Sequence, residues 1–350
     1  MSDHDPNDVS PAREFGGVEA GSGRSVGAAS GAAPTVPANV CNPLSKPYRT
    51  GSYLIFDMPT CEASGDRCSG GGPDHFRTAM ELEPNPYPAS GSHQLNADQL
   101  TQILSTKVVS RYEPRDLFLV DLREESHGFI NRRAASWYAD NDFGNVGVAK
   151  SQIERDERAR LEVLEGETTQ VFKIDDDSSD NRGQERMMPV SYQTVTAETA
   201  ATERTLVDEV VIGNCTVHYL RIPVTDHCAP SDVALAEFGK LATSSEPKSS
   251  WLHFHCHGGD GRTTTFLALY DMVCWKRRSR DPLPDLEVFA RRQYGLPPNY
   301  CLNPDGCDWT KPSSPPTNPP SPPTAGWKRP LALKRWQVLK DFHEKLSAGL

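Results

Sequence analysis

The sequence lacks several features by which a protein class is often recognised. Its 350 residues contain no apolar run long enough to span a membrane, and the N-terminal segment has no apolar core of the kind found in signal peptides. Positive charge is also scarce, because 37 Lys and Arg stand against 47 Asp and Glu, which gives a formal net charge of −10. This balance argues against a general binder of nucleic acids or membrane surfaces. A polyanionic ligand would therefore need a locally basic pocket.

Paired cysteine motifs are absent as well. None of the nine cysteines belongs to a Cys-x-x-Cys motif, so the sequence favours thiols in a reducing compartment over a disulfide framework. The pairs Cys61 with Cys68 and Cys301 with Cys307 remain as alternatives. The acidic run at 175–177 is expected to be a solvated loop and not a metal site.

The chain divides into an N-terminal tail and one folded domain. Residues 1–45 are rich in Gly, Ala, Ser and Pro and almost free of aromatics, so we expect a disordered leader there. Residues 46–350 are numerous enough to bury a sizeable core. The proline-rich segment 312–323 is expected to form an extended loop within this domain.

Apolar patterns predict an α/β fold. Strands are expected at residues 53–56, 117–120, 169–174, 216–224 and 251–254. Helices are expected at residues 97–111, 231–241, 262–279 and 331–347, the last with Trp336, Leu339, Phe342 and Leu346 facing inward. Charged and hydroxylic residues dominate 150–205, where short alternating runs predict strands. The segment 126–128 is expected to be a polar turn.

The most specific motif is residues 255–263 (His-Cys-His-Gly-Gly-Asp-Gly-Arg-Thr), between an apolar strand and a helix. A glycine-rich turn there directs backbone N–H groups and the positive end of the helix at one point, where an oxyanion such as phosphate fits. Cys256, beside that point, would be held as thiolate. Arg262, at the start of the helix, can donate to two phosphate oxygens. The alternative is a buried inert thiol in a turn.

The spacing Cys-x5-Arg alone has little value, because it occurs four times in this chain. The segment 215–221 alternates like a strand, and 274–280 lies in a basic helical run without glycine. The segment 61–67 contains glycine but continues into Cys-Ser-Gly-Gly-Gly-Pro, which cannot begin a helix at once. Only the segment 256–262 has the strand, the glycines, the helix and a hydroxyl after the arginine.

Three polar clusters each follow an apolar strand, namely residues 123–127, residues 226–227 and residues 256–262. In an open α/β sheet, ligands bind outside the carboxyl ends of the strands, so the three clusters could line one crevice. Asp226 would then protonate a leaving group, although it could instead cap the helix that follows. His227 could be structural or could bind substrate.

The same cluster predicts a phosphatase mechanism. Cys256 would attack phosphorus in line while Arg262 and the loop amides hold the phosphate oxygens. Thr263 would donate its hydroxyl to the sulfur, and His255 would brace the loop. A water deprotonated by Asp226 would then hydrolyse the thiophosphate. No metal or cofactor is required.

The motif of residues 255–263 is the signature of cysteine-dependent phosphatases of the protein-tyrosine-phosphatase (PTP) type. Extended to residue 272, it resembles the bacterial PTP-like phytases, which remove phosphates from myo-inositol hexakisphosphate. Similar segments lie at residues 76–78, 90–92, 121–128, 136–138, 225–227 and 327–328, so the resemblance covers about residues 50–350. It implies a PTP-like core, a central sheet flanked by helices, with a small partial β-barrel within about 150–205.

The resemblance also implies which residues bind substrate. They would be His257, Gly258, Gly259, Asp260, Gly261, Arg77, Arg123, His227 and Lys328, of which Arg77 and Lys328 are named by the resemblance alone. We expect Arg77 and Lys328 to meet at the mouth of the pocket, with Arg123 behind them. His127 and Lys311 could add to these cations. Two positions depart from the phytase pattern, because His257 stands where glutamate is usual and Asp260 replaces a small apolar residue. Asp260 would repel a neighbouring phosphate if it faced the substrate, and would have no effect if it turned away.

Other functions on the same fold remain open. One is a phosphatase for phosphotyrosine proteins or inositol lipids, and another is a non-catalytic phosphate-binding module. The complete set of Cys256, Arg262, Asp226 and Thr263 argues against the module, because a binding site needs no acid. The small-residue-rich head also resembles the leaders of type III secreted effectors of plant-pathogenic bacteria. Such a protein would reach the host cell, whereas without secretion it would stay in the bacterial cytoplasm.

Overall fold

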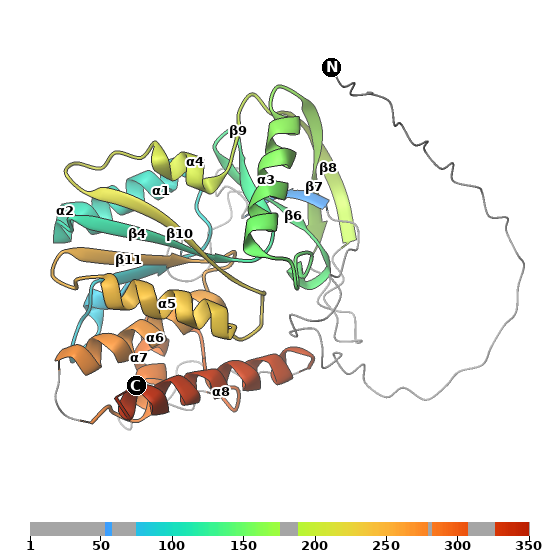
Figure 1. Ribbon diagram of the computed structural model, residues 1–350. Helices are drawn as coiled ribbons and strands as arrows, with labels where there is room; N and C mark the ends of the chain where they lie inside the picture. The colour runs from blue at the N-terminus through green and yellow to red at the C-terminus, as the bar shows by residue number, and fades with distance from the viewer. Residues whose placement is uncertain (1–52, 58–74, 176–187, 279–281, 307–325, 350) are drawn as a thin grey trace, which may run out of the picture. The chain divides into compact units, whose positions relative to one another are not determined.

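The structure, a computed structural model, describes residues 53–57, 75–175, 188–278, 282–306 and 326–349. All of them belong to one compact unit. The expected leader at 1–45, the expected loop at 312–323, Cys61 and Lys311 lie outside the described residues. Within the described part, helices and strands alternate along the chain, which confirms the α/β class (Figure 1). No helix of this part is long and apolar enough to cross a membrane.

A five-stranded sheet forms the centre of the unit, in the order β10-β4-β11-β3-β2. Its strands are β2 (Arg77–Thr78), β3 (Ala89–Ser92), β4 (Asp116–Arg123), β10 (Thr216–Val224) and β11 (Ser250–His255). The strands from β10 to β3 are parallel, and β2 is antiparallel to β3. Since parallel strands end at the same edge, the residues that follow β4, β10 and β11 can meet there.

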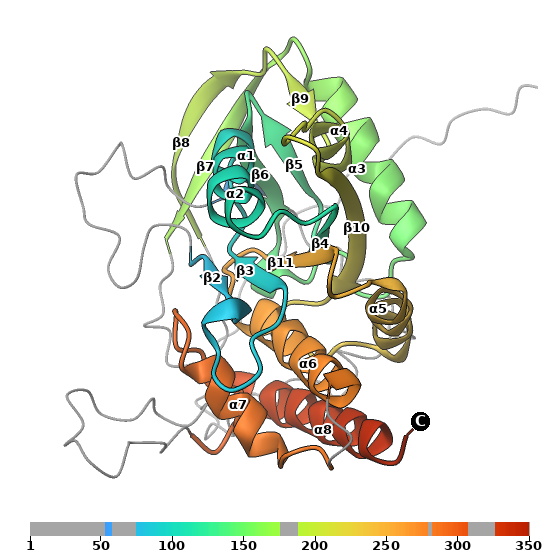
Figure 2. The same cartoon turned by 90° about the vertical axis from the view of Figure 1, so that its left-hand side faces the viewer.

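Helices lie on both sides of the five-stranded sheet (Figures 1 and 2). One side carries α5 (Asp232–Ser244), α6 (Gly261–Arg278), α7 (Leu286–Tyr294) and α8 (Lys328–Ser347). The other carries α1 (Ala97–Ile103), the π-helical turn η2 (Leu104–Val109), α2 (Ser110–Tyr112) and α4 (Glu203–Asp208). Because both faces are covered, every residue of β11 is buried and the strand shows no polar alternation.

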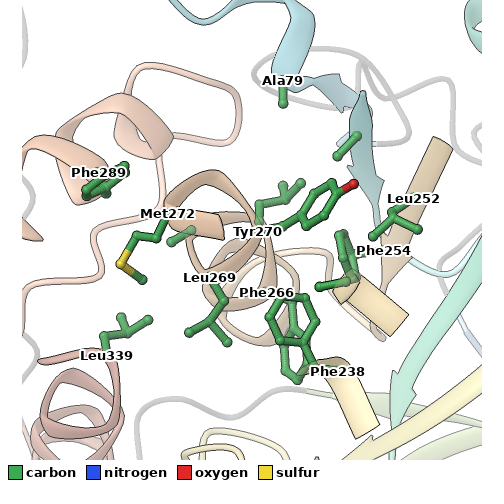
Figure 3. Packing of buried hydrophobic residues seen from close by; sticks show 14 of the residues in the cluster. Ala79, Phe238, Leu252, Phe254, Phe266, Leu269, Tyr270, Met272, Phe289 and Leu339 are labelled. Carbon is green, nitrogen blue, oxygen red and sulfur yellow. The ribbon is translucent and has the colours of Figure 1, made fainter. Parts of the chain in front are cut away.

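Helix α6 is buried along its first three turns. Figure 3 shows Phe254 of β11 beside Phe266 and Tyr270 of α6, with Phe238 of α5 next to them. The rings of Phe238 and Phe266 meet edge to face, with centroids 5.5 Å apart. Leu339 of α8 is also in this cluster, as predicted. The packing fixes the position of the first turn of α6, where the phosphate-binding motif ends.

A second sheet has six strands in the order β8-β7-β1-β6-β5-β9. They are β1 (Tyr53–Phe56), β5 (His127–Ile130), β6 (Arg133–Tyr138), β7 (Thr168–Asp175), β8 (Met188–Thr196) and β9 (Ala200–Ala201). The range 150–205 therefore supplies only part of this sheet, and the six described strands do not close into a complete barrel. The segment 126–128, expected to be a turn, includes the start of β5 because its backbone pairs with β6.

The sequence pattern does not predict helix α3 (Lys150–Leu164), which contacts β5 and β9. Its buried residues Ile153, Glu157 and Leu161 have helical spacing, but the middle one is charged. Glu157 can be buried because Arg221 of β10 donates to it, with Nη1 2.7 Å from Oε2. Because a charged residue occupies the inner face, the apolar residues of this helix do not show a regular helical spacing in the sequence.

Cysteine pairing differs from the sequence prediction. Cys228 and Cys301 each take part in a disulfide bond, whereas the sequence favours thiols. The alternative partner named for Cys301, Cys307, lies outside the described residues. Arg335 of α8 donates to the carbonyl of Cys228 at 3.4 Å and to the hydroxyl of Tyr300, next to Cys301, at 2.7 Å. In the described part of the chain, the free cysteines are Cys215, Cys256 and Cys274.

Candidate active site

Residues 256–260 form a tight loop between β11 and α6, as the sequence predicts. Gly259 has a φ of +75°, and a Cβ on it would lie 2.5 Å from the backbone nitrogen of His93, so the position requires glycine. Gly261 opens α6, and a Cβ on it would lie 2.7 Å from Nη1 of Arg335. The loop and the helix N-terminus together make an arrangement that favours anions. We call residues 256–262 the phosphate loop.

Cys256 has two hydrogen-bond donors directed at its sulfur. The residue is 3% exposed, and its Sγ accepts from the backbone N–H of Gly259 and from the hydroxyl of Thr263, each at 3.2 Å. Donors of this kind favour a negatively charged sulfur. The cysteines of two other Cys-x5-Arg segments differ, because burial raises the pKa of Cys215 and raises that of Cys274 to about 12.

Arg262 lies between two carboxylates. Its guanidinium donates to Glu125 through Nη1 at 2.6 Å and Nη2 at 2.9 Å, and Nη2 is 3.2 Å from Oδ1 of Asp226. Burial opposes ionisation of Glu125, but Arg262 and Arg123 outweigh it and hold the pKa of Glu125 well below its usual value. The sequence analysis did not single out Glu125, although it lies in the polar cluster 123–127 that follows β4.

Asp226 comes two residues after β10 and reaches the phosphate loop through Arg262. Its side chain is 26% exposed and accepts from the backbone N–H of His227 at 2.9 Å. The alternative role as a helix cap is not observed, because Ser231 caps α5 by accepting from the N–H of Ala234. Burial opposes ionisation of Asp226, but Arg262 and His227 lower the pKa of Asp226 below its usual value.

His227 links this carboxylate to an aromatic residue. It has a φ of +60°, and its Nε2 lies 3.3 Å from Oδ2 of Asp226. Its ring meets the ring of Trp327 edge to face, with centroids 5.1 Å apart. Trp327 in turn meets Phe143 in the same way at 6.3 Å. Two segments that the resemblance singles out, residues 225–227 and 327–328, are therefore in contact through His227 and Trp327.

His255 and His257 flank the cysteine and have different surroundings. His255 is buried, with Nε2 3.5 Å from Oε1 of Glu203, which fits the bracing role expected for it. His257 lies between Asp57 and Asp142, 3.6 Å from each. Burial alone would lower the pKa of His257, but both carboxylates raise it above its usual value.

Asp142 is a carboxylate that the sequence analysis did not find. Burial and the neighbouring Glu125 raise the pKa of Asp142 to about 6. It lies in the short helix η3 (Asp140–Asp142), in a segment without any motif.

Asp260 pairs with His75, which lies two residues before β2. Its Oδ1 lies 3.4 Å from Nδ1 of His75, and its side chain is about half exposed. The same nitrogen lies 3.0 Å from the carbonyl of Gly258. Burial would lower the pKa of His75, but the hydrogen bond to Asp260 is the larger effect and raises it. Asp260 thus has a hydrogen-bond partner at the loop itself.

Two of the outer cations that the resemblance implies are not at the surface. Arg77 is 3% exposed and donates to the carbonyl of Gly259 at 2.7 Å and to the hydroxyl of Thr264 at 2.8 Å. Arg123 is 0% exposed and donates to Asp57 at 2.6 Å and to Glu125 at 2.8 Å. The expectation that Arg77 stands at the mouth of the site is therefore wrong, because it supports the loop from within.

The other two expected cations, His127 and Lys328, differ in their position. His127 is buried between carboxylates beneath the site. Lys328 is the first residue of α8, and its Nζ lies 5.5 Å from the ring centroid of Trp327. Trp327 contacts His227, which in turn contacts Asp226, so Lys328 is linked to the acid through these two side chains.

Two groups of buried side chains in the described part of the chain have the donor types of a metal site. They are Asp121 with His127 and Glu203, and Glu125 with Asp142 and His257. In each group a carboxylate already pairs with an arginine, since Asp121 lies 3.4 Å from Arg221 and Glu125 binds Arg262. The positive charge of an arginine bonded to a possible ligand would repel a metal cation, so we assign no metal to either group.

Comparisons with known proteins agree with this geometry. The family model of PTP-like phytases, whose description names inositol hexakisphosphate, matches residues 120–274. The effector protein HopD2 of Pseudomonas syringae pv. tomato is 27% identical over 157 residues, which are 45% of this chain and 31% of that protein.

Two solved structures from Mitsuokella multacida have the same fold. One is a tandemly repeated PTP-like phytase, with a TM-score of 0.63 and 27% identity over 87% of this chain and 48% of that chain. The other is a PTP-like myo-inositol phosphatase in complex with myo-inositol-(1,3,4,5)-tetrakisphosphate, with a TM-score of 0.63 and 26% identity over the same shares. This chain therefore spans about half the length of those structures, and less of HopD2. Residues 120–274, which match the model of the PTP-like phytases, contain the phosphate loop, Glu125 and Asp226.

Proposed function

We propose that this chain hydrolyses the phosphomonoesters of inositol polyphosphates, with myo-inositol hexakisphosphate (phytate) as substrate. The observation that carries the proposal is the meeting of Cys256, Arg262 and Asp226 at one loop, with the sulfur already accepting two hydrogen bonds. The substrate class is supported by the description of the matching family and by the inositol phosphate bound to the M. multacida protein.

The first step transfers the phosphoryl group to the enzyme. The thiolate of Cys256 attacks phosphorus and forms a P–S bond, while the ester bond between phosphorus and the inositol oxygen breaks. Arg262 and the loop amides stabilise the charge on the equatorial oxygens. Asp226 gives its proton to the departing alkoxide, which would otherwise be a poor leaving group.

Asp226 must hold a proton for this step, although Arg262 and His227 lower its pKa in the free protein. A bound phosphate dianion changes this balance in two ways. It adds negative charge beside the carboxyl, and it takes hydrogen bonds from Arg262, whose charge keeps Asp226 ionised. Both effects raise the pKa of Asp226 when substrate is bound.

The second step returns the enzyme to its starting state. Asp226, now a carboxylate, takes a proton from water while the water oxygen attacks phosphorus. The P–S bond breaks, phosphate is released, and Cys256 leaves as thiolate. The hydroxyl of Thr263, 3.2 Å from the sulfur, stabilises that leaving group.

The test is phosphate release from phytate by the purified full chain. We expect turnover by the wild type and none by Cys256→Ser, because serine is a far weaker nucleophile in this position. Cys215→Ser is the matched control, since Cys215 also begins a Cys-x5-Arg segment but lies at the opposite end of β10. An inactive Cys215→Ser enzyme with an active Cys256→Ser enzyme would show that the nucleophile is misassigned.

A phosphotyrosine phosphatase is the second candidate, and the aromatic residue Trp327 beside His227 favours it. The two candidates differ in how substrate is held, because a phosphotyrosine ring needs aromatic walls and phytate needs cations. A phosphotyrosine peptide should therefore be assayed in parallel with phytate. Hydrolysis of the peptide without hydrolysis of phytate under the same conditions would decide for this second function.

We also propose that the protein acts as a secreted effector. The support is the name of its relative HopD2, an effector protein, and the small-residue-rich composition of residues 1–45. A reporter enzyme fused to residues 1–45 should be delivered into plant cells by a bacterium with a functional type III system. Equal delivery by a strain without that system would contradict the proposal.

A further inference from the structure

Arg335 of α8 is a buried guanidinium, 4% exposed. Its Nη1 donates to the hydroxyl of Tyr300 at 2.7 Å and its Nε to the carbonyl of Cys228 at 3.4 Å. No carboxylate of the described residues forms an ion pair with it. Both acceptors are neutral, so no side chain in the described part of the protein compensates the positive charge of Arg335.

Such a charge is costly to bury, because an ion removed from water without a counter-ion loses several kcal/mol of solvation. Two buried arginines outside the phosphate loop follow the usual rule, since Arg292 pairs with Asp271 at 2.9 Å and Arg221 pairs with Glu157 at 2.7 Å. Arg335 and Arg77 differ from them, because neither forms an ion pair with a described carboxylate. For Arg335 this points to a counter-ion that binds from outside.

The position of Arg335 identifies where that anion would be. A Cβ on Gly261 would lie 2.7 Å from Nη1 of Arg335, so the guanidinium lies against the phosphate loop where α6 begins. Its second contact, Cys228, is two residues beyond Asp226. Helix α8, which carries Arg335, packs beside α6 (Figure 2). Arg335 therefore touches the phosphate loop and the loop of the acid at the same time.

Charges at the phosphate loop support this assignment. Arg262 is neutralised by Glu125 and Asp226 before any ligand binds. Arg77 contacts the opposite part of the loop, at Gly259, and forms no ion pair with a described carboxylate. Burial lowers the pKa of Arg77 to about 10, so it stays charged at neutral pH. The loop thus lies between two guanidiniums that no described carboxylate compensates, which matches the double negative charge of a phosphoryl group.

We propose that Arg335 is a positioning residue for phosphate at this loop. Its side chain holds Gly261 and the segment at Cys228 in place. It also supplies a positive charge whose counter-ion is the bound phosphoryl group. The inference rests on the proposed function, because it assumes that the loop binds phosphate. It concerns binding and not turnover, so it can be tested separately. Without Arg335, phosphate should bind less tightly even when the loop itself is intact.

The experiment measures the Kd of inorganic phosphate by calorimetry on the full chain, for the wild type, Arg335→Gln and Arg335→Lys. We expect a Kd about tenfold higher for Arg335→Gln, which corresponds to the loss of one nearby charge in a partly buried site. Arg335→Lys should restore most of the affinity, because it keeps the charge although it cannot make both hydrogen bonds. The Kd of Arg335→Gln should also depend less on salt.

Arg292→Gln is the matched control, because it removes a buried arginine that has a carboxylate partner and does not contact the loop. It should lower the melting temperature and leave the Kd of phosphate unchanged. If Arg335→Gln does not fold, Tyr300→Glu offers the same test, since it brings a carboxylate to Arg335 and should also raise the Kd. An unchanged Kd in Arg335→Gln or in Tyr300→Glu would overturn the inference.

The outcomes for the two proposals can be told apart. A wild-type protein that binds phosphate through Arg335 but hydrolyses no ester would contradict the proposed function and uphold the inference. A wild-type protein that hydrolyses phytate, with equal phosphate affinity in Arg335→Gln, would do the reverse. A wild-type protein that does not bind inorganic phosphate would overturn the inference, and one that also releases no phosphate from phytate would overturn both.

Discussion

Glu125 holds the guanidinium of Arg262 in a fixed orientation, through hydrogen bonds of 2.6 and 2.9 Å to its two carboxylate oxygens. The same carboxylate accepts from Nε of Arg123 at 2.8 Å, and Arg123 continues to Asp57 at 2.6 Å. A row of alternating charges thus runs from the phosphate loop into the second sheet, where Asp57 also accepts from Ser136 of β6 at 2.6 Å. The second sheet therefore helps to orient the arginine that would bind phosphate.

Glu125→Gln should reduce both activity and stability. Glutamine keeps the shape but removes the charge, so two buried arginines lose their shared partner, at a cost of about 3–5 kcal/mol. A misplaced Arg262 should lower kcat/KM by about 10²-fold. Steady-state kinetics and thermal melting check both effects. Asp271→Asn, which removes the partner of Arg292, is the control for stability, and an equal loss of kcat/KM in that variant would contradict a specific role of Glu125.

The phosphate loop was predictable because its information is local. A buried strand, a glycine turn and a helix follow one another in residues 251–270, and each part has a short-range cause. Gly259 shows this directly, since its positive φ and its contact with His93 exclude any side chain. The meeting of Asp226 with the loop was predictable too, because parallel strands end at one edge.

The partners of the site were not predictable, because they are pairs between distant segments. Asp57, Asp142 and Arg335 lie in segments without a motif, and only the fold brings them to the loop. The sequence also does not show in which direction a side chain points. For this reason Arg77 was expected at the mouth of the pocket, whereas it is buried behind the phosphate loop. Residue type shows what a group can bind, whereas its burial depends on the whole fold.

Asp226→Asn tests the acid through the choice of leaving group. Hydrolysis of an alkyl phosphate such as phytate should fall by about 10²–10⁴-fold, because the alkoxide needs a proton. An aryl phosphate with a good leaving group should lose less, since its phenolate departs without help. Comparison of kcat for phytate and for p-nitrophenyl phosphate checks the difference. Equal losses on both substrates would show that Asp226 acts only through the position of Arg262.

Loss of the proton from His127 should make the protein less stable at alkaline pH. Its Nε2 lies 3.3 Å from Asp121 and 3.4 Å from Glu203. Burial disfavours the charged ring, but Asp121 outweighs it and the pKa of His127 rises to about 10. Since this value exceeds that of an unfolded histidine, the stabilisation is complete below about pH 6.5 and is lost as pH rises towards 10.

The check is the free energy of unfolding of the wild type and of His127→Gln between pH 6.5 and 10. The variant should be less stable at pH 6.5 by roughly 3–5 kcal/mol, because the carboxylates lose a buried cation. The difference between the two proteins should shrink as pH rises, since the wild type then loses the same charge. A difference that stays constant over this range would show that His127 is not charged in the folded protein.

Lys328 should determine how well phytate binds, because it is the expected cation that remains near the acid once Arg77 and Arg123 are found buried. Its ammonium lies over the ring of Trp327, and that ring contacts His227. Phytate carries several phosphates, and those outside the phosphate loop need cations in a protein of net charge −10. Lys328→Ala should therefore raise the KM for phytate several-fold and leave kcat nearly unchanged. The rise corresponds to a loss of about 1 kcal/mol of binding free energy.

The salt dependence and a matched variant show whether the charge itself is responsible. In Lys328→Ala the KM for phytate should rise less steeply with ionic strength, because fewer charges remain to be screened. The KM for p-nitrophenyl phosphate should stay the same, since this substrate occupies only the phosphate loop. Lys334→Ala removes an equal charge from the same helix, but at a cavity lined by Val146 and Leu331. If Lys334→Ala raises the KM for phytate as much as Lys328→Ala does, the effect comes from net charge alone, and Lys328 has no specific place in the site.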